Sequence, residues 1–265
     1  MFELIQYTFF QHALLAALLT AVSCGITGTY IVSKRIVFIS GGITHTSFGG
    51  IGIGYFLGIN PLLGAAVFSL LAAFGIEYMS EKSKVREDSA IAIMWSFGMA
   101  VGIIFIYLTP GYAPNLMTYL FGSILTVTRS EILLMILLAA IISLFFIIFH
   151  KVILYITFDP DFAKTRNIPV QTFNYLLIGL VALTIVMSIK VAGIILIISL
   201  LTLPQTTANL FTNKFRTIIL LSVIIALVGS IGGLLVSYAL DIPSGASIIF
   251  LLVLLYLIAR VIKKP

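Results

Sequence analysis

Long apolar runs separated by short polar clusters follow one another along the whole chain. The runs lie near residues 12–33, 36–56, 61–80, 90–108, 131–149, 172–189, 191–210, 217–238 and 245–262. Each run has roughly the length that a helix needs to cross a hydrocarbon layer ~30 Å thick. The pattern therefore predicts an all-α, polytopic transmembrane helical bundle of about 8–9 spans.

Two parts of the chain need a separate interpretation. A weaker apolar stretch at residues 116–127 follows a turn rich in proline and glycine at residues 109–114. This stretch is too short to span a bilayer, so we expect an interfacial or re-entrant helix there. The first run has no positive segment before it and no small-residue cleavage site after it, so we expect a retained span and not a signal peptide.

Composition excludes a water-soluble globular domain, because 61% of the residues are hydrophobic and 9% are charged. The 265 residues leave room for a single transmembrane domain over 1–265 and no separate soluble domain. The net charge of +6 comes from basic residues near the ends of the apolar runs, which favours topology anchors over a nucleic-acid-binding patch. The single cysteine, Cys24, excludes a disulfide framework.

The orientation follows from the distribution of lysine and arginine. When alternate loops are assigned to opposite sides, 13 of the 15 basic residues fall on one side and only Arg129 and Lys190 on the other. The positive-inside bias identifies the basic side as cytoplasmic. We therefore expect a multi-pass protein of the cytoplasmic (inner) membrane, with its N-terminus outside and its C-terminus in the cytoplasm.

The second apolar run is unusually polar. Residues 39–50 contain one histidine, four hydroxyl side chains and four glycines. Gly41, His45 and Gly49 are spaced by four and share one helix face. An ionisable group at this depth is costly and commonly faces a water-filled path or a partner. The predicted translocation-path residues are His45, Thr44, Ser47, Gly41 and Gly49.

His45 has two interpretations on chemistry alone. A neutral imidazole binds Zn²⁺ and other first-row metals, so His45 is a candidate transient metal ligand. Alternatively, His45 only packs against a neighbouring helix through a polar contact. His12 and His150 lie near the ends of their runs, so neither supplies a second imidazole at this depth.

Residues 157–169 predict a short cytoplasmic helix with both ends specified. Asp159 suits the N-cap and Pro160 the first helical position. Asn167 can adopt the left-handed conformation that ends a helix, and Pro169 prevents its continuation. Such a helix suits docking into a groove on a partner, or else it rests on the lipid headgroups.

Motifs of membrane-associated chemistry do not occur in this sequence. It has no nucleotide-binding G-x-x-x-x-G-K-[ST] loop, no H-E-x-x-H and no G-x-S-x-G. We therefore expect a non-catalytic chain. If transport is driven by ATP, another subunit supplies the ATP site.

Four stretches in order resemble the membrane permease subunits of ABC importers for zinc, manganese and iron. They are residues 42–50 (GITHTSFGG), 158–168 (FDPDFAKTRNI), 191–208 (from VAGI to LPQTTA) and 241–246 (DIPSGA). They are similar to that family's D-A-I-S-H-A-x-x-P-G segment, its F-D-P-E-x-A-x-x-x-G-I loop, its V-G-x-L-L span and its D-x-P-x-G turn. Together they extend from the second run to the last.

The resemblance implies a type II ABC importer-like permease that forms a homodimer or pairs with a second permease. It implies two cytoplasmic ABC ATPase subunits as partners and an extracytoplasmic metal-binding protein. The cargo is a divalent metal ion, and no cofactor is bound stably. His45 would line the path, and the short cytoplasmic helix would couple it to the ATPase. The implied coupling residues are Asp159, Pro160, Asp161, Phe162, Ala163, Lys164 and Asn167.

This sequence departs from the family pattern at two positions. The family has an aspartate four residues before the histidine, where this chain has Gly41, and a glycine where it has Asn167. The first departure leaves open a permease for iron chelates or cobalamin-like cofactors. An ion-coupled secondary carrier is a further alternative. Carriers commonly use carboxylates at mid-depth, whereas Glu77 and Asp241 lie near the ends of runs.

Overall fold

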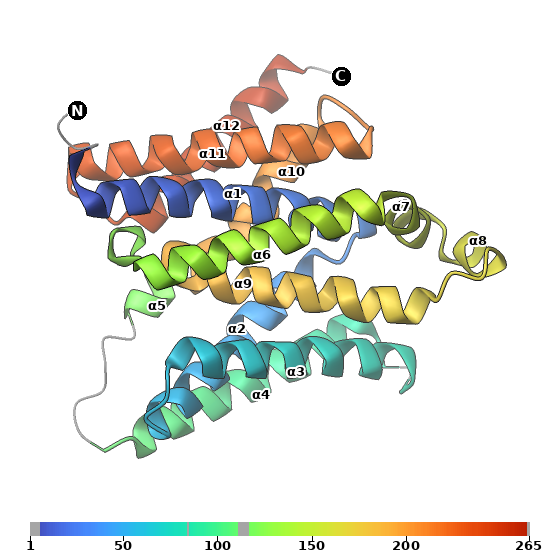
Figure 1. The fold of residues 1–265 in the computed structure, drawn as a ribbon, viewed down its shortest axis with the longest axis horizontal. Helices are drawn as coiled ribbons and strands as arrows, with labels where there is room; N and C mark the ends of the chain where they lie inside the picture. The colour runs from blue at the N-terminus through green and yellow to red at the C-terminus, as the bar shows by residue number, and fades with distance from the viewer. Residues whose placement is uncertain (1–5, 84, 111–116, 264–265) are drawn as a thin grey trace. The chain divides into compact units, whose positions relative to one another are not determined.

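The computed structural model describes residues 6–83, 85–110 and 117–263. Within these residues the chain is helical and has no strand, which confirms the all-α prediction (Figure 1). The elements are α1 (Thr8–Lys34), α2 (Val37–Phe56), α3 (Pro61–Glu81), α4 (Glu87–Leu108), α5 (Met117–Phe121), the 3₁₀ turn η2 (Ile124–Thr126), α6 (Arg129–Ile148), α7 (His150–Phe158), α8 (Pro160–Thr165), α9 (Val170–Leu200), α10 (Leu203–Asn209), α11 (Phe215–Leu240) and α12 (Ser244–Ile262).

Seven helical stretches of the described residues are long and apolar enough to cross a membrane. Two differences separate this number from the predicted eight to nine spans. The predicted spans at 172–189 and 191–210 both lie in one 40-residue stretch, Val170–Asn209, which is interrupted at Gly193 with φ 76° and ψ 161°. The other difference is α2, whose 20 residues include His45 and many small polar side chains that lower its mean hydropathy.

The chain divides into two compact units, each assembled from separate stretches. Unit 1 comprises Met1–Ser33, Met117–Ile148 and Met187–Pro265, and unit 2 comprises Lys34–Leu116 and Phe149–Val186. The boundaries fall at the end of α1, before α5, between α6 and α7, and within α9. Unit 2 therefore contains both the polar helix α2 and the short helix α8.

In unit 2, α2 packs against both α3 and α4 through backbone contacts at glycine. A Cβ atom added at Gly50 would collide with the carbonyl oxygen of Gly64 on α3. One added at Gly98 on α4 would lie 2.5 Å from the Cα of Thr46. Small residues at helix interfaces allow this close approach in membrane proteins. The three helices leave no space for even a methyl group at these crossings.

Unit 1 has its own core. Helix α11 packs against α10 and α12, and the backbone of Gly233 meets Ile248 so closely that an added Cβ would lie 2.5 Å from its Cα. A second cluster of buried apolar residues joins α1 to η2, α6, α9 and α11. Its members are Phe10, Ala13, Ala16, Ala17, Ile124, Val127, Ile132, Met135, Val191 and Leu234.

The segment before α6 contains only short helical pieces, α5 and η2, and neither is long enough to span a membrane, as predicted for residues 116–127; residue 116 lies outside the described residues. Gly122 and Gly193 both have positive φ, at 72° and 76°, and their backbones are in direct contact. The Ser123 amide donates a hydrogen bond to the carbonyl of Lys190, at 2.8 Å. This segment is therefore fastened to α9 where that helix is interrupted.

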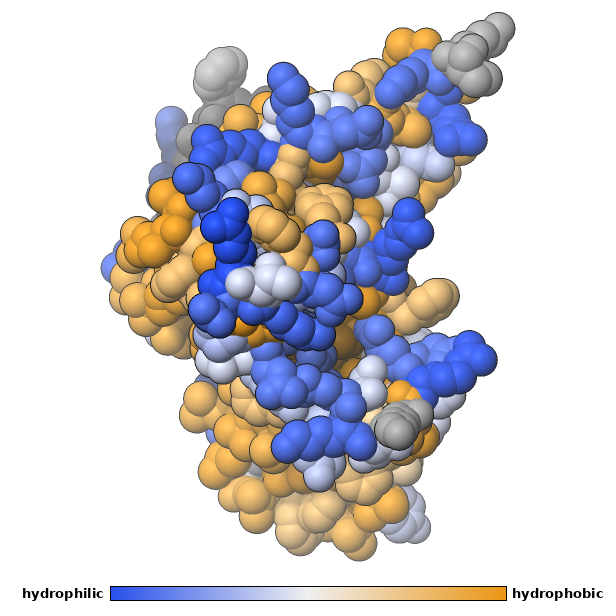
Figure 2. Space-filling model, turned by 90° about the vertical axis from the view of Figure 1, so that its right-hand side faces the viewer, coloured by the Kyte–Doolittle hydropathy of each residue, from blue (hydrophilic) through white to orange (hydrophobic). Residues whose placement is uncertain are grey.

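Apolar side chains are exposed along several long helices, among them Leu63, Val67 and Leu71 on α3 and Leu133, Leu137 and Leu144 on α6. A lipid environment would cover such side chains. Figure 2 views the molecule from the side on which α8 lies, and hydrophilic residues gather at that end. Exposed charged residues there include Asp159, Asp161, Lys164 and Arg166.

Candidate functional site

His45 lies on α2 in unit 2, where its half-buried ring stacks on the indole of Trp95 from α4. The ring centroids are 4.0 Å apart and the planes are inclined by 9°. Among the hydrogen bonds of the described residues, none involves a ring nitrogen of His45. Parallel stacking uses the face of the imidazole and leaves its nitrogen-bearing edge free. The contact therefore fixes the ring without occupying either potential ligand atom.

The hydroxyl groups around His45 are engaged within the helix. Thr44 donates to the carbonyl of Ser40, and Ser47 donates to the carbonyl of Thr44, each at 2.5 Å. Thr46 donates to the carbonyl of Gly42 at 2.6 Å and lies 3.0 Å from that of Met94 on α4. All three side chains are fully buried. Their protons satisfy backbone oxygens, as buried hydroxyls in apolar surroundings require.

The two glycines on the His45 face are both buried. A Cβ at Gly49 would lie 2.8 Å from the carbonyl oxygen of Gly98 and 2.8 Å from the ring of Phe68, so Gly49 is part of the helix packing. Gly41 carries no carboxylate where the family pattern has one. Among the described residues, no group of three or more histidine, cysteine, aspartate or glutamate side chains is placed to hold a metal ion.

The predicted cap of the short cytoplasmic helix is present at α8. The Phe162 amide donates to Oδ1 of Asp159 at 2.9 Å, and Pro160 occupies the first helical position. An exposed ion pair joins Lys164 to Asp161 at 2.9 Å. These contacts define the start of a helix of only six residues.

The end of α8 is closed by the residue that replaces the family glycine. Asn167 has a φ of 56°, its amide donates to the carbonyl of Lys164, and the amide of Ile168 donates to the carbonyl of Ala163. This pair of bonds is a Schellman motif with asparagine in the left-handed position. Ala163 is buried, whereas Phe162 and its charged neighbours are exposed. Most of α8 is therefore accessible to a partner.

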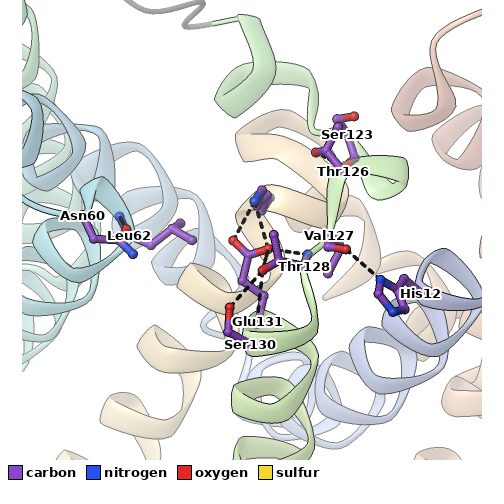
Figure 3. Close-up of polar contacts among 10 residues, drawn as sticks. His12, Asn60, Leu62, Ser123, Thr126, Val127, Thr128, Ser130 and Glu131 are labelled. Carbon is purple, nitrogen blue, oxygen red and sulfur yellow. Dashed lines mark hydrogen bonds and ion pairs between the residues drawn. The ribbon is translucent and has the colours of Figure 1, made fainter. Parts of the chain in front are cut away.

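Sequence reasoning missed a polar cluster in unit 1 at the start of α6 (Figure 3). Lys190 pairs with Glu131 at 2.7 Å, and the same carboxylate accepts the Thr128 amide at 2.8 Å. The Val127 carbonyl lies 3.2 Å from Nδ1 of His12. The T-x-x-E spacing of residues 128–131 is a capping-box signal that could have identified the helix start. Nothing local in the sequence indicates that Lys190 is its ion-pair partner.

Comparison with known proteins gives matches over almost the full chain. The sequence pattern of the ABC 3 transport family matches residues 6–263. An uncharacterized membrane protein of Synechocystis, slr2045, is 40% identical over 264 residues, covering 100% of this chain and 94% of that protein. The manganese transport system membrane protein MntC of Halalkalibacterium halodurans is 33% identical over 257 residues, covering 97% and 88%.

A solved structure also matches almost the full length of the chain. A chain of PsaBC from Streptococcus pneumoniae, determined in complex with a Fab, superimposes with a TM-score of 0.88 at 32% identity and covers 97% of this chain and 93% of its own length. Fold and sequence thus agree from α1 to α12. The chain belongs to the ABC 3 transport family, which confirms the resemblance to metal-ion ABC permeases drawn from its four motifs.

Proposed function

We propose that this chain is the permease subunit of an ATP-driven importer that carries a divalent metal ion, namely zinc, manganese or iron, across the cytoplasmic membrane. The similarity to a manganese transport system membrane protein supports a metal as cargo. The permease itself does not catalyse a reaction. A separate cytoplasmic ABC ATPase hydrolyses ATP, and an extracytoplasmic metal-binding protein delivers the ion.

The observation that carries this proposal is α8, a short helix specified at both ends and exposed over most of its surface. An isolated helix of this length is not stable in water. The caps of α8 therefore stabilise it and keep its exposed surface in one conformation. We take α8 as the helix that docks into the ATPase. A second copy of this chain, or a second permease, completes the membrane part of the transporter.

His45 is the residue we assign to the metal path. Its ring is held by Trp95, and its nitrogens make no hydrogen bond with the described residues. The same segment contains Thr44, Ser47 and Gly49. The two hydroxyls donate to the backbone of α2, and Gly49 allows close packing against α4. Gly41 keeps the same helix face small, four residues before His45.

The test is uptake of radiolabelled zinc, manganese and ferrous iron by cells that lack this gene and carry either the wild-type chain or His45→Ala. We expect His45→Ala to reduce uptake about tenfold or more, because it removes a metal ligand. Membrane insertion and association with the ATPase should be retained. His150→Ala, at the start of α7, is the control and should leave uptake unchanged.

The outcomes separate the candidate functions. Unchanged uptake by His45→Ala would limit His45 to a packing role. Normal uptake of all three ions in cells without the gene would contradict the free metal as cargo. That result would favour a metal chelate or a cobalamin-like cofactor, the alternative that the missing carboxylate at Gly41 leaves open. Uptake that persists without any ATPase would favour a secondary carrier.

A further inference from the structure

The side chain of Lys34, at the end of α1, joins this residue to α9 within unit 2. Its ammonium donates a hydrogen bond to Oδ1 of Asn174 on α9, at 3.0 Å. The carboxylates of Glu77 on α3 and Glu87 on α4 attract the same charge. Asn174 also lies near the Glu77 carboxylate. All four side chains are half-buried, which makes such charge-assisted contacts stronger than exposed ones.

Asn174 lies close to α8 along the chain. The Schellman motif at Asn167 and Ile168 closes α8, and α9 begins at Val170. In the first turn of α9, Gln171 donates to Glu81 at the end of α3, at 2.5 Å. The start of α9 is therefore bonded to the ends of both α1 and α3.

A groove of about 520 Å³ lies beside α8, lined by residues of α3, α8 and α9 that include Glu81, Lys164 and Gln171. Gln171, Thr172 and Asn174 of α9 line the same groove as Lys164 of α8. Gln171 also bonds directly to Glu81 of α3. A displacement of α8 would then reach the rest of unit 2 through α9.

Lys34 is the last residue of α1 and the first residue of unit 2. After it the chain passes through Arg35, which has a φ of 63°, and enters α2 at Val37. Glycine contacts pack α2 tightly against α3 and α4, and a helix packed this closely is displaced as a unit and not deformed locally. The same helix carries His45.

We propose that the Asn174–Lys34 contact transmits movement of α8 to α2, and that Asn174 is a positioning residue for the transport step. This inference rests on the proposed function, because it takes α8 as the ATPase-docking helix. It assigns the link between ATP hydrolysis and the position of His45 to Asn174 and Lys34, which lie outside the predicted site.

The test uses the complete transporter in proteoliposomes, with its ATPase and its binding protein. For Asn174→Ala we expect the ATPase to remain bound and its basal rate to stay unchanged. The number of metal ions carried per ATP should fall about tenfold, as should the stimulation of ATP hydrolysis by the loaded binding protein. Lys34→Arg, in the otherwise wild-type chain, keeps the charge and the donor and should retain most of the wild-type ratio. Thr172→Ala, exposed on the same turn of α9, is the control.

An unchanged ratio of ions to ATP in Asn174→Ala would overturn the inference, and so would loss of ATPase binding, since Asn174 would then only hold α8 in place. If Asn174→Ala fails to insert into the membrane at all, a double variant replaces it. Lys34→Met combined with Glu77→Gln removes the contact together with one positive and one negative charge, and its ratio of ions to ATP decides in the same way. If the wild-type transporter carries none of the three metals, the proposed function is contradicted. The inference about Asn174 can still be judged, because stimulation of ATP hydrolysis by the binding protein reports the link between α8 and α2.

Discussion

The contact between His45 and Trp95 fixes the position of an imidazole and leaves its nitrogen atoms available. Stacked aromatic rings contribute stabilisation beyond the area that they bury. A histidine held by its face is also ordered before a ligand arrives, so less entropy is lost on binding. The neighbouring hydroxyls cannot perform this task, because Thr44 and Ser47 donate to the backbone of α2. Trp95 is thus the residue that defines where the imidazole edge points.

Replacing Trp95 tests this role. We expect Trp95→Ala to raise the metal concentration for half-maximal uptake about fivefold, the effect of one lost aromatic pair, while Trp95→Phe retains most of the wild-type affinity. The measurement is uptake as a function of metal concentration. Phe97→Ala is the matched control, since Phe97 is an exposed aromatic residue of α4 whose ring lies near Phe68. Equal half-saturation for Trp95→Ala and wild type would contradict the role.

Local chemistry was readable from the sequence, and long-range pairing was not. The cap at Asp159 and the left-handed Asn167 were predicted correctly because each depends on a few adjacent residues. The partner of His45 was not, because Trp95 lies on another helix and nothing in the spacing of α4 marks it. The pairing of Lys190 with Glu131 and of Lys34 with Asn174 was missed for the same reason.

At the scale of elements, α8 depends on its termini more than on its length. Six residues give few internal hydrogen bonds, and a helix this short is not stable without caps. Its N-cap is an aspartate and its C-terminus is closed by a Schellman motif. Both ends are therefore fixed with respect to α7 and α9, and the exposed side chains of α8 keep a defined arrangement.

Substitutions of Asp159 distinguish the effect of its capping hydrogen bond from the effect of its negative charge. Asp159→Ala should destabilise α8 by about 1 kcal/mol and weaken ATPase binding about fivefold. Asp159→Asn keeps a capping oxygen and should bind like the wild type. Binding of the purified ATPase to the permease in detergent gives both affinities. Equal loss in both variants would show that the charge, and not the cap, matters; no loss in either would remove Asp159 from the docking helix.

At the scale of the whole molecule, the apolar runs predicted the helices well because spans are selected by length and hydropathy. The division into two units could not be predicted. Its boundaries fall at the end of α1, before α5, between α6 and α7 and inside α9, and nothing in the sequence indicates which of the stretches between them pack together. The sequence predicted a break at residue 190 between two spans, whereas the structure has one 40-residue stretch interrupted three residues later, at Gly193.

The predicted orientation can be tested with single thiols. We expect Ser130→Cys, in the first turn of α6, to react with a membrane-impermeant maleimide in intact cells. Thr172→Cys, at the start of α9, should react only after permeabilisation. Both native side chains are exposed. The native Cys24 is buried and should stay unlabelled in the folded chain. The reverse labelling pattern would contradict an external N-terminus.

The polarity of α2 has a consequence for biogenesis. A segment with a histidine, several hydroxyls and many glycines gains little free energy by entering lipid alone. Its backbone is covered instead by α3 and α4, which follow it in the chain and meet it at glycine. We therefore expect nascent α2 to wait at the translocon until these later helices emerge. The glycine contacts that now hold His45 in place would then also set the order of membrane insertion during synthesis.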